Sequence, residues 1–111
     1  MIHNADTDTC LATAPLHADT FWLRLSGLML RTTFPAGSDA LIFTTRGLHT
    51  CFLRLPIDIL FVDATHQVCG LRNALPSWRF VLQRRAKFAI ELPAGVIRDS
   101  GTEVGHHLLW D

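Results

Sequence analysis

Residues 57–63 constrain the fold of this chain more than any other part of its sequence. They are rich in β-forming types, and their apolar side chains occupy both faces of an extended chain. This pattern is typical of a central strand that is covered on both sides. Asp58 enters this strand, where a carboxylate is costly to desolvate unless it is paired or hydrogen-bonded. We therefore predict a core on both sides of the strand and a partner for Asp58.

Short, regularly spaced strands are predicted for much of the remaining chain. Alternation and short apolar runs indicate them at residues 9–16, 40–43, 68–71, 86–92 and 107–110. In the range 86–92, every second residue from Ala86 to Leu92 is expected to face the core, which leaves Lys87, Ala89 and Glu91 on the polar face.

Two short helices complete the predicted elements. Helical spacing of apolar residues indicates one at 20–29, where Asp19 or Thr20 can cap it, and a single turn is expected at 96–100, ended by Gly101. The predicted fold class is mainly β with a minor α component. It is a compact, antiparallel-rich, barrel-like or rolled sheet with one or two short helices.

The length of 111 residues predicts one domain, over residues 9–111, after a flexible N-terminal tail at 1–8. An apolar share of 49% with zero net charge excludes an intrinsically disordered chain. No apolar run reaches the ~18 residues of a membrane helix, so no membrane contact is predicted. Residues 1–20 contain no Lys or Arg, unlike the start of a secretory signal, and the expected location is cytoplasmic.

Basic residues gather in one part of the chain. Residues 72–88 contain Arg72, Arg79, Arg84, Arg85 and Lys87 without any acid, interleaved with Trp78, Phe80 and Phe88. Such a patch could contact RNA or an acidic partner, or it could be a solvated strand edge. The balanced pI of 7.0 disfavours a dedicated nucleic-acid binder. Trp78 is expected to be the most exposed tryptophan, and an exposed tryptophan beside arginines is typical of an interaction surface.

The order of several sequence blocks resembles a known family. These blocks are residues 27–31 (GLMLR), 40–43 (ALIF), 49–63 (HTCFLRLPIDILFVD) and 89–95 (AIELPAG), followed by Gly105. The chain resembles the bacterial and archaeal domain of unknown function numbered 192, from about Thr9 to Trp110. The resemblance implies a small, mainly β fold and carries no assigned catalytic activity.

This chain departs from the family pattern at a few positions. Leu53 stands where Met is usual, Cys51 where an aromatic or small residue is common, and His106 where Asp usually follows Gly105. The segment 63–66 lacks the usual Gly. If the family uses the Asp after Gly105, this chain has lost or altered that function.

Asp58 is the centre of the predicted polar site. Its candidate partners are Arg31, His49, Arg54 and the backbone amides at the Pro56 turn. In one interpretation Asp58 pins a turn and one arginine; in the other it lines a shallow anion or amide pocket with His49 and Arg31. The predicted binding residues are Arg31, His49, Thr50, Arg54, Asp58, Trp78 and Arg79.

We favour a non-enzymatic binding or accessory module, with a small ligand or a protein as partner. The alternative is a small hydrolase or acyl-transfer enzyme that uses His49 with Asp58 or Cys51. His49 and Cys51 lie two residues apart, so an extended chain would place them on one side, roughly 7 Å apart. The sequence contains no phosphate loop, nucleophile elbow or paired-carboxylate motif.

No metal, cofactor or disulfide is predicted. Adjacent histidines such as His106 and His107 point to opposite faces of a strand, and the three cysteines lack metal-ligand spacing. The sequence does not predict the ligand or the oligomeric state.

Overall fold

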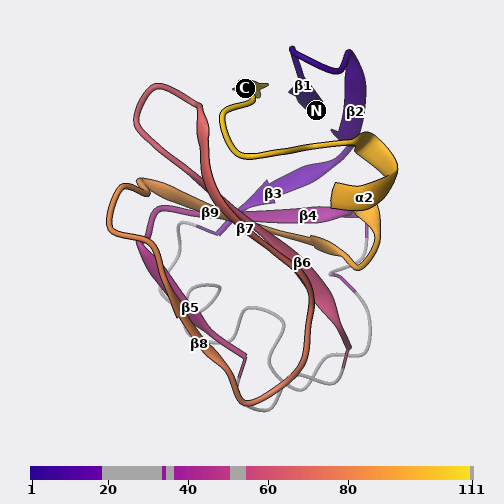
Figure 1. Cartoon of the computed structure of the whole chain (residues 1–111). Coiled ribbons are helices and arrows are strands. Elements are labelled where there is room, and N and C mark those ends of the chain that lie inside the picture. The colour runs from indigo at the N-terminus through magenta and orange to yellow at the C-terminus, as the bar shows by residue number, and fades with distance from the viewer. Residues whose placement is uncertain (19–33, 35–36, 51–54, 111) are drawn as a thin grey trace.

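A computed structural model describes residues 1–18, 34, 37–50 and 55–110. The described elements are β1 (Ile2–Asn4), β2 (Thr9–Ala12), β3 (Pro15–His17), β4 (Ala40–Phe43), β5 (Gly47–His49), β6 (Ile57–Val62), β7 (Val68–Leu75), β8 (Phe80–Leu82), β9 (Phe88–Pro93), α2 (Val96–Ser100) and β10 (Leu108–Leu109). They form a central sheet with smaller elements above and below it (Figure 1). No described helix is long and apolar enough to cross a membrane.

The central sheet has five strands in the order β3-β4-β9-β6-β7. β3 and β4 run parallel, and the other neighbours run antiparallel. Every residue of β6 is buried, as the apolar pattern of this segment predicts. β6 lies between β9 and β7, so both its edges are hydrogen-bonded and both its faces are covered.

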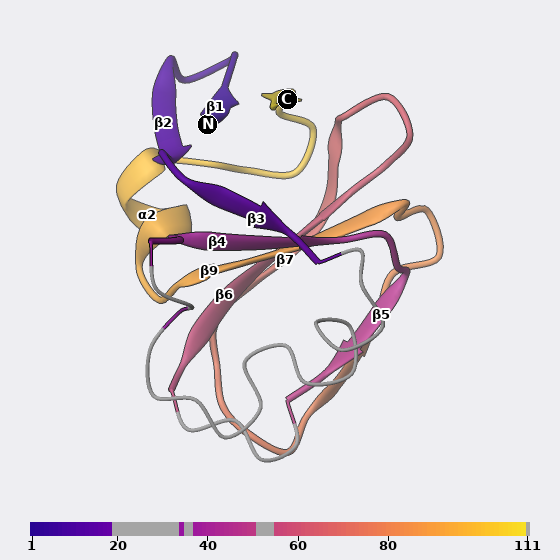
Figure 2. The same cartoon turned by 180° about the vertical axis from the view of Figure 1, so that it is seen from behind.

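Two apolar cores flank the central sheet. On one face, Ile42, Leu60 and Ile90 pack with Ile2 of the small sheet β10-β1-β2 and Ile97 of α2. On the other face the buried residues are Ala18, Leu41, Phe43, Ile57, Ile59, Phe61, Ala86 and Ala89. Leu48 of β5 and Val81 of β8 pack against this second core, so the two-stranded sheet β5-β8 lies across it (Figure 2).

The mainly β, antiparallel-rich fold class is confirmed. The described strands form three separate sheets and no closed barrel. Strands are found where the sequence predicts them at 40–43, 57–62 and 68–71, and the last strand and the helical turn Val96–Ser100 are also present. The predicted range 9–16 divides into β2 and β3, and the predicted helix at 20–29 lies outside the described residues.

The polar face predicted for the strand at 86–92 is wrong. Ala89 is fully buried and Glu91 is 5% exposed, although both were expected to face solvent. The reason is the position of β9 in the sheet. It lies between β4 and β6, and the second core covers the face that the sequence pattern assigns to water.

The flexible tail predicted for residues 1–8 is also wrong. β1 pairs with β2 and β10, and both Ile2 and Asn4 are fully buried. The Nδ2 of Asn4 donates to Thr102 Oγ1 at 3.1 Å, and its Oδ1 accepts from the backbone N–H groups of Asp6 and Thr7. The polar residues that dominate this end of the chain conceal a strand that pairs both with the adjacent β2 and with β10 at the other end.

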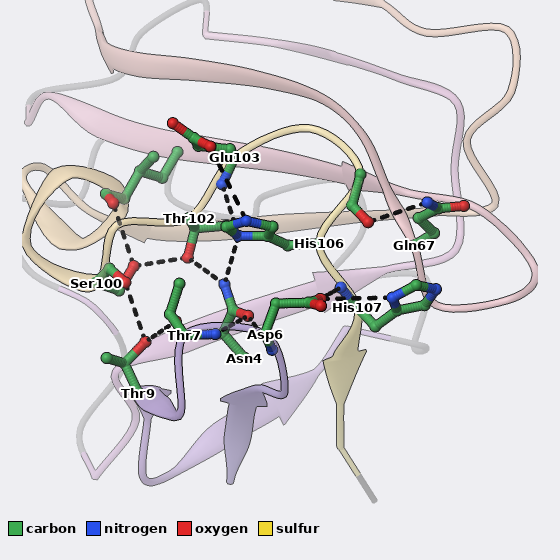
Figure 3. A network of polar contacts seen from close by, with 12 residues as sticks. Asn4, Asp6, Thr7, Thr9, Gln67, Ser100, Thr102, Glu103, His106 and His107 are labelled. Atoms are coloured by element: carbon green, nitrogen blue, oxygen red, sulfur yellow. Dashed lines mark hydrogen bonds and ion pairs between the residues drawn. The ribbon is translucent and has the colours of Figure 1, made fainter.

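His106 extends the contacts of Asn4 (Figure 3). Its Nδ1 lies 3.1 Å from both Asn4 Nδ2 and the backbone N of Glu103, which are both N–H donors. Nδ1 therefore accepts, and the ring proton belongs on Nε2. Ser100 and Thr102 join the same network through a 2.7 Å contact between their hydroxyls. The network ties β1 to the segment that follows α2.

Replacing Asn4 with Ala is expected to lower the free energy of unfolding by about 2 kcal/mol, because the buried side-chain amide that bonds the Asp6 and Thr7 N–H groups and Thr102 is lost. Urea denaturation of both proteins measures this change. Replacing Thr13, which is exposed, with Ala is the control for a nearby polar residue outside the network. A change for Asn4→Ala within the ~0.5 kcal/mol typical of surface sites would show that the network contributes little.

Candidate binding surface

Strands β5 and β8 form a two-stranded ribbon, called here the β5–β8 ribbon. His49 pairs with Phe80, Leu48 with Val81, and Gly47 with Leu82. Because side chains alternate along a strand, Leu48 and Val81 point to the second core while Phe80 and Leu82 point away from it. Phe80 is 81% exposed and Leu82 is 66% exposed. The ribbon thus presents large apolar side chains to solvent on one face.

A shallow apolar depression of about 410 Å³ follows this ribbon. Among the described residues, its lining comes from β5 and β8, with the His49 and Phe80 rings 6.2 Å apart and tilted at one end. At the other end, Gly47 allows the two strands to approach closely. A Cβ at this position would lie 3.3 Å from Leu82 Cδ1 and 3.1 Å from the Val81 carbonyl oxygen. The depression is therefore a property of the strand pairing itself.

Thr50 fixes the turn that carries Trp78 and Arg79. It is 2% exposed, and its hydroxyl donates to the Pro76 carbonyl at 2.7 Å and accepts from the Arg79 N–H at 2.8 Å. Its backbone N–H donates to the Arg79 carbonyl, and its carbonyl accepts from the Trp78 N–H. These bonds hold Trp78 in the left-handed backbone region, at φ 63°, with its side chain 58% exposed.

Several predicted site residues therefore come together. His49, Thr50, Trp78 and Arg79 all lie on the β5–β8 ribbon or at its end. The sequence predicts two separate sites, one around His49 and one around Trp78, because it does not reveal that residues 47–49 pair with residues 80–82. Arg31 and Arg54 lie outside the described residues, as does Cys51.

A cationic depression adjoins the ribbon. It has a volume of about 480 Å³, and its charged lining is Arg46 from the β4–β5 connection with Arg84, Arg85 and Lys87 from the β8–β9 connection. The backbone N–H of Gln83 donates to the Arg46 carbonyl at 2.8 Å and joins the two connections. None of these cations forms an ion pair with any carboxylate of the described residues.

Asp58 belongs to a different part of the molecule. It lies in β6, in a different sheet from His49, and is fully buried. Its Oδ1 accepts from the Ala74 N–H at 2.8 Å, and its Oδ2 from those of Gly95 at 3.0 Å and Ile97 at 2.9 Å. The prediction of a hydrogen-bonded Asp58 is confirmed. The Pro56 turn and His49, however, are not among its partners in the described part of the chain.

The three amides that bind Asp58 come from β7 and from the start of α2. Ala74 and Gly95 both have positive φ, at 46° and 100°, so the carboxylate holds an irregularity in β7 and the turn before α2, two places whose conformation favours glycine. Asp58 lines an open depression of about 770 Å³ beside α2, but its oxygens are committed to the backbone. With three backbone N–H groups bound, the carboxylate of Asp58 holds the surrounding backbone in place.

Glu91 is a buried carboxyl that the sequence pattern missed. Its neighbours in β4 and β6 are Leu41 and Ile59, which both belong to the second core. Its Oε2 is buried without a hydrogen-bond partner among the described residues. Burial raises the pKa of Glu91 from its ordinary value of 4.5 to about 8. A buried carboxyl with a strongly shifted pKa is a recognised signal of a functional position, although ion-pair networks can also shift a pKa.

A metal site and an activated thiol are the remaining chemical possibilities among the described residues. No group of three or more His, Cys, Asp and Glu side chains there could hold a metal ion. The thiol of Cys69 is free, and burial together with the nearby Asp63 raises its pKa, which disfavours the nucleophilic thiolate. Cys10 is also free, and it is exposed.

Comparison with known proteins identifies the family. The family model DUF192, described as "Uncharacterized ACR, COG1430", matches residues 3–110. The chain belongs to this family. A UPF0127 protein of Thermococcus sibiricus is 38% identical over 102 residues, which cover 85% of this chain and 64% of that protein. The family match begins within β1, so the strand that replaces the predicted tail is part of the family's domain.

A further relative agrees with this assignment, and a solved structure shares the fold. UPF0127 protein PF1050 of Pyrococcus furiosus is 36% identical over 98 residues, covering 85% of this chain and 84% of that protein. A crystal structure of a protein of unknown function from Novosphingobium aromaticivorans has a TM-score of 0.74 at 19% identity. It covers 86% of this chain and 74% of that one, and at this identity it shows a shared fold.

Proposed function

We propose that this member of the DUF192 family is a non-enzymatic binding module whose protein partner docks on the β5–β8 ribbon. The observation that carries the proposal is the paired exposure of Phe80 and Leu82 on one face of a fixed strand pair. Large apolar side chains grouped on a surface mark interaction sites, whereas single exposed ones need no explanation. Trp78, also exposed at the end of the ribbon, adds a residue type that is enriched at binding hot spots.

The ribbon is already organised for binding. Strand pairing fixes Phe80 and Leu82, and the hydrogen bonds of Thr50 fix the turn that carries Trp78. A surface that is ordered before binding loses less conformational entropy when a partner docks. The inward side chains Leu48 and Val81 anchor the ribbon to the second core, so the outer face is free of a structural role in that core.

The enzyme alternative lacks a comparable geometric basis. A His49–Asp58 couple requires the two side chains in one site, but they lie in different sheets and Asp58 binds three backbone amides. His49 is exposed, and its ring lies against Phe80. This arrangement supports His49 as a rim residue of the apolar depression. Hydrolase or acyl-transfer chemistry thus remains the second candidate only through Cys51, which the described residues do not include.

Site-specific cross-linking tests the proposal. A photoreactive amino acid is placed at position 82 on the ribbon or, as a control, at position 104, where Val104 is 61% exposed. A protein that is captured from position 82 and not from position 104 is purified, and its affinity is measured for the native protein, Phe80→Ser/Leu82→Ser and Val104→Ser. We expect the double ribbon variant to lose at least about tenfold in affinity, because it removes apolar anchors. Val104→Ser should bind as the native protein does.

The contrary results are equally specific. Equal affinity of the native protein and the double ribbon variant would place the contact elsewhere. Turnover of esters or amides by the native protein, absent in a folded His49→Gln variant, would instead support the enzyme alternative. Circular dichroism of each variant checks that the fold is retained.

A further inference from the structure

We infer that the partner segment is acidic, and that it lies along the β5–β8 ribbon and continues over the cationic depression formed by Arg46, Arg84, Arg85 and Lys87. This inference rests on the proposed function and specifies the chemistry of the partner. The two features are contiguous along both chain segments. β5 begins directly after Arg46, and β8 ends two residues before Arg84. The pair Gly47–Leu82 marks the boundary between them.

Among the described residues, the cations of the depression have no carboxylate partner. Residues 64–90 contain no Asp or Glu, and no described carboxylate forms an ion pair with any of the four cations. Asp63 is the first acid before this range, and its Oδ1 already accepts from the hydroxyl and N–H of Thr65 and from the Gln67 N–H. The charges therefore remain available to an external anion. The chain as a whole is neutral, so this is a local feature and not a general basic character.

The spacing of the ribbon suits an extended polypeptide. Phe80 and Leu82 are two residues apart on a strand, which corresponds to roughly 7 Å, and alternate side chains of an extended peptide have the same spacing. Two apolar side chains of the partner can thus contact this face, and carboxylates further along the same segment then reach the cations. Arginine binds carboxylates with a bidentate geometry, so Arg46, Arg84 and Arg85 suit Asp and Glu side chains.

Other polyanions fit this surface less well. Binding of a nucleic-acid single strand relies on successive aromatic side chains with cations along the track. Here Trp78 and Phe80 lie toward one end of the ribbon, and the aliphatic Leu82 separates them from the four cations of the depression at the other end. An acidic protein segment with apolar residues uses both features.

The test uses synthetic probes and the intact chain. The main probe is a fluorescent peptide with two leucines at alternate positions followed by a run of glutamates, and its partner probe has glutamine in place of every glutamate. We expect the acidic peptide to bind more tightly than the glutamine peptide. We also expect Arg84→Glu/Arg85→Glu to weaken its binding by about tenfold or more, since close charge pairs across interfaces contribute strongly. Arg98→Glu is a control charge reversal at one site outside the depression, because Arg98 is exposed on α2.

Each outcome separates the inference from the proposed function. If both peptides bind equally and only Phe80→Ser/Leu82→Ser weakens them, the ribbon is a binding surface but the acidic partner is wrong. If neither peptide binds the native protein, or Arg84→Glu/Arg85→Glu binds as the native protein does, the inference fails. Tighter binding of oligodeoxythymidine, or of vesicles that contain phosphatidylserine, would also overturn it and assign the surface to nucleic acid or membrane. Loss of acidic-peptide binding in both double variants, but not in Arg98→Glu, supports it.

Discussion

Replacing Glu91 with Gln is expected to stabilise the protein strongly at pH 8 and very little at pH 4. In the folded chain the pKa of Glu91 is raised to about 8 by burial, whereas in the unfolded chain it is close to the ordinary 4.5. The folded state therefore holds a proton that the unfolded state releases between these values. The contribution of Glu91 to stability is fully present below about pH 4.5. It is lost progressively as the pH rises from there through 8.

The size of this effect follows from the difference between the two pKa values. Each unit of pKa difference corresponds to about 1.4 kcal/mol, so the full loss for Glu91 is of the order of 5 kcal/mol. Glutamine has nearly the same shape and does not titrate, so the variant should lack this fall in stability. Urea denaturation at a series of pH values between 4 and 9 measures it. Glu103→Gln is the matched control, because Glu103 has an exposed side chain.

Two results would contradict this account of Glu91. If the pH profiles of the native protein and Glu91→Gln run parallel, Glu91 does not hold a proton in the folded state. If Glu91→Gln destabilises the protein at every pH, the carboxylate has a partner that the amide cannot replace. In either case the buried carboxyl of Glu91 would not lower the stability of the folded state at neutral pH.

The sequence predicts the central part of the fold because local patterns decide it. The largely apolar segment from Ile57 to Val62 predicts a central strand in a sheet that is covered on both faces. The structure confirms this prediction, since every residue of the strand is buried. Glu91 shows the limit of the same reasoning. The alternation of one strand does not reveal that β4 and β6 flank it and that a second core covers its other face.

Part of the candidate site could be predicted, and long-range pairing hides the rest. His49, Thr50, Trp78 and Arg79 were predicted from residue type alone, and their meeting depends on the pairing of β5 with β8. The exposed Phe80 and Leu82 were not among the predicted site residues, since an apolar residue in a strand is expected to face a core. His66 shows a similar limit. It takes a φ of 65° in a segment that lacks the usual Gly, and its ring stacks on Trp110 at 3.9 Å.

Asp58→Asn is expected to lower the free energy of unfolding by about 3 kcal/mol, which is far more than a surface substitution costs. The two carboxylate oxygens accept three backbone N–H groups, from residues 16, 37 and 39 positions away along the chain. An Asn side chain has one acceptor oxygen, so its NH₂ group must face at least one of these donors and leave it unsatisfied. The same change disturbs the β7 backbone at Ala74 and the turn at Gly95 together, because Asp58 holds both.

Urea denaturation of Asp58→Asn at neutral pH measures this loss, with Asp99→Asn as the exposed control on α2. Amide hydrogen exchange adds a local measurement, since protection should fall first at the N–H groups of Ala74, Gly95 and Ile97 that lose a charged acceptor. A change in stability no larger than that of Asp99→Asn would mean that the amides find other acceptors. A loss of stability of the expected size would show that Asp58 joins β6, β7 and the start of α2. This structural role would then explain why an aspartate stands in the sequence block at 49–63.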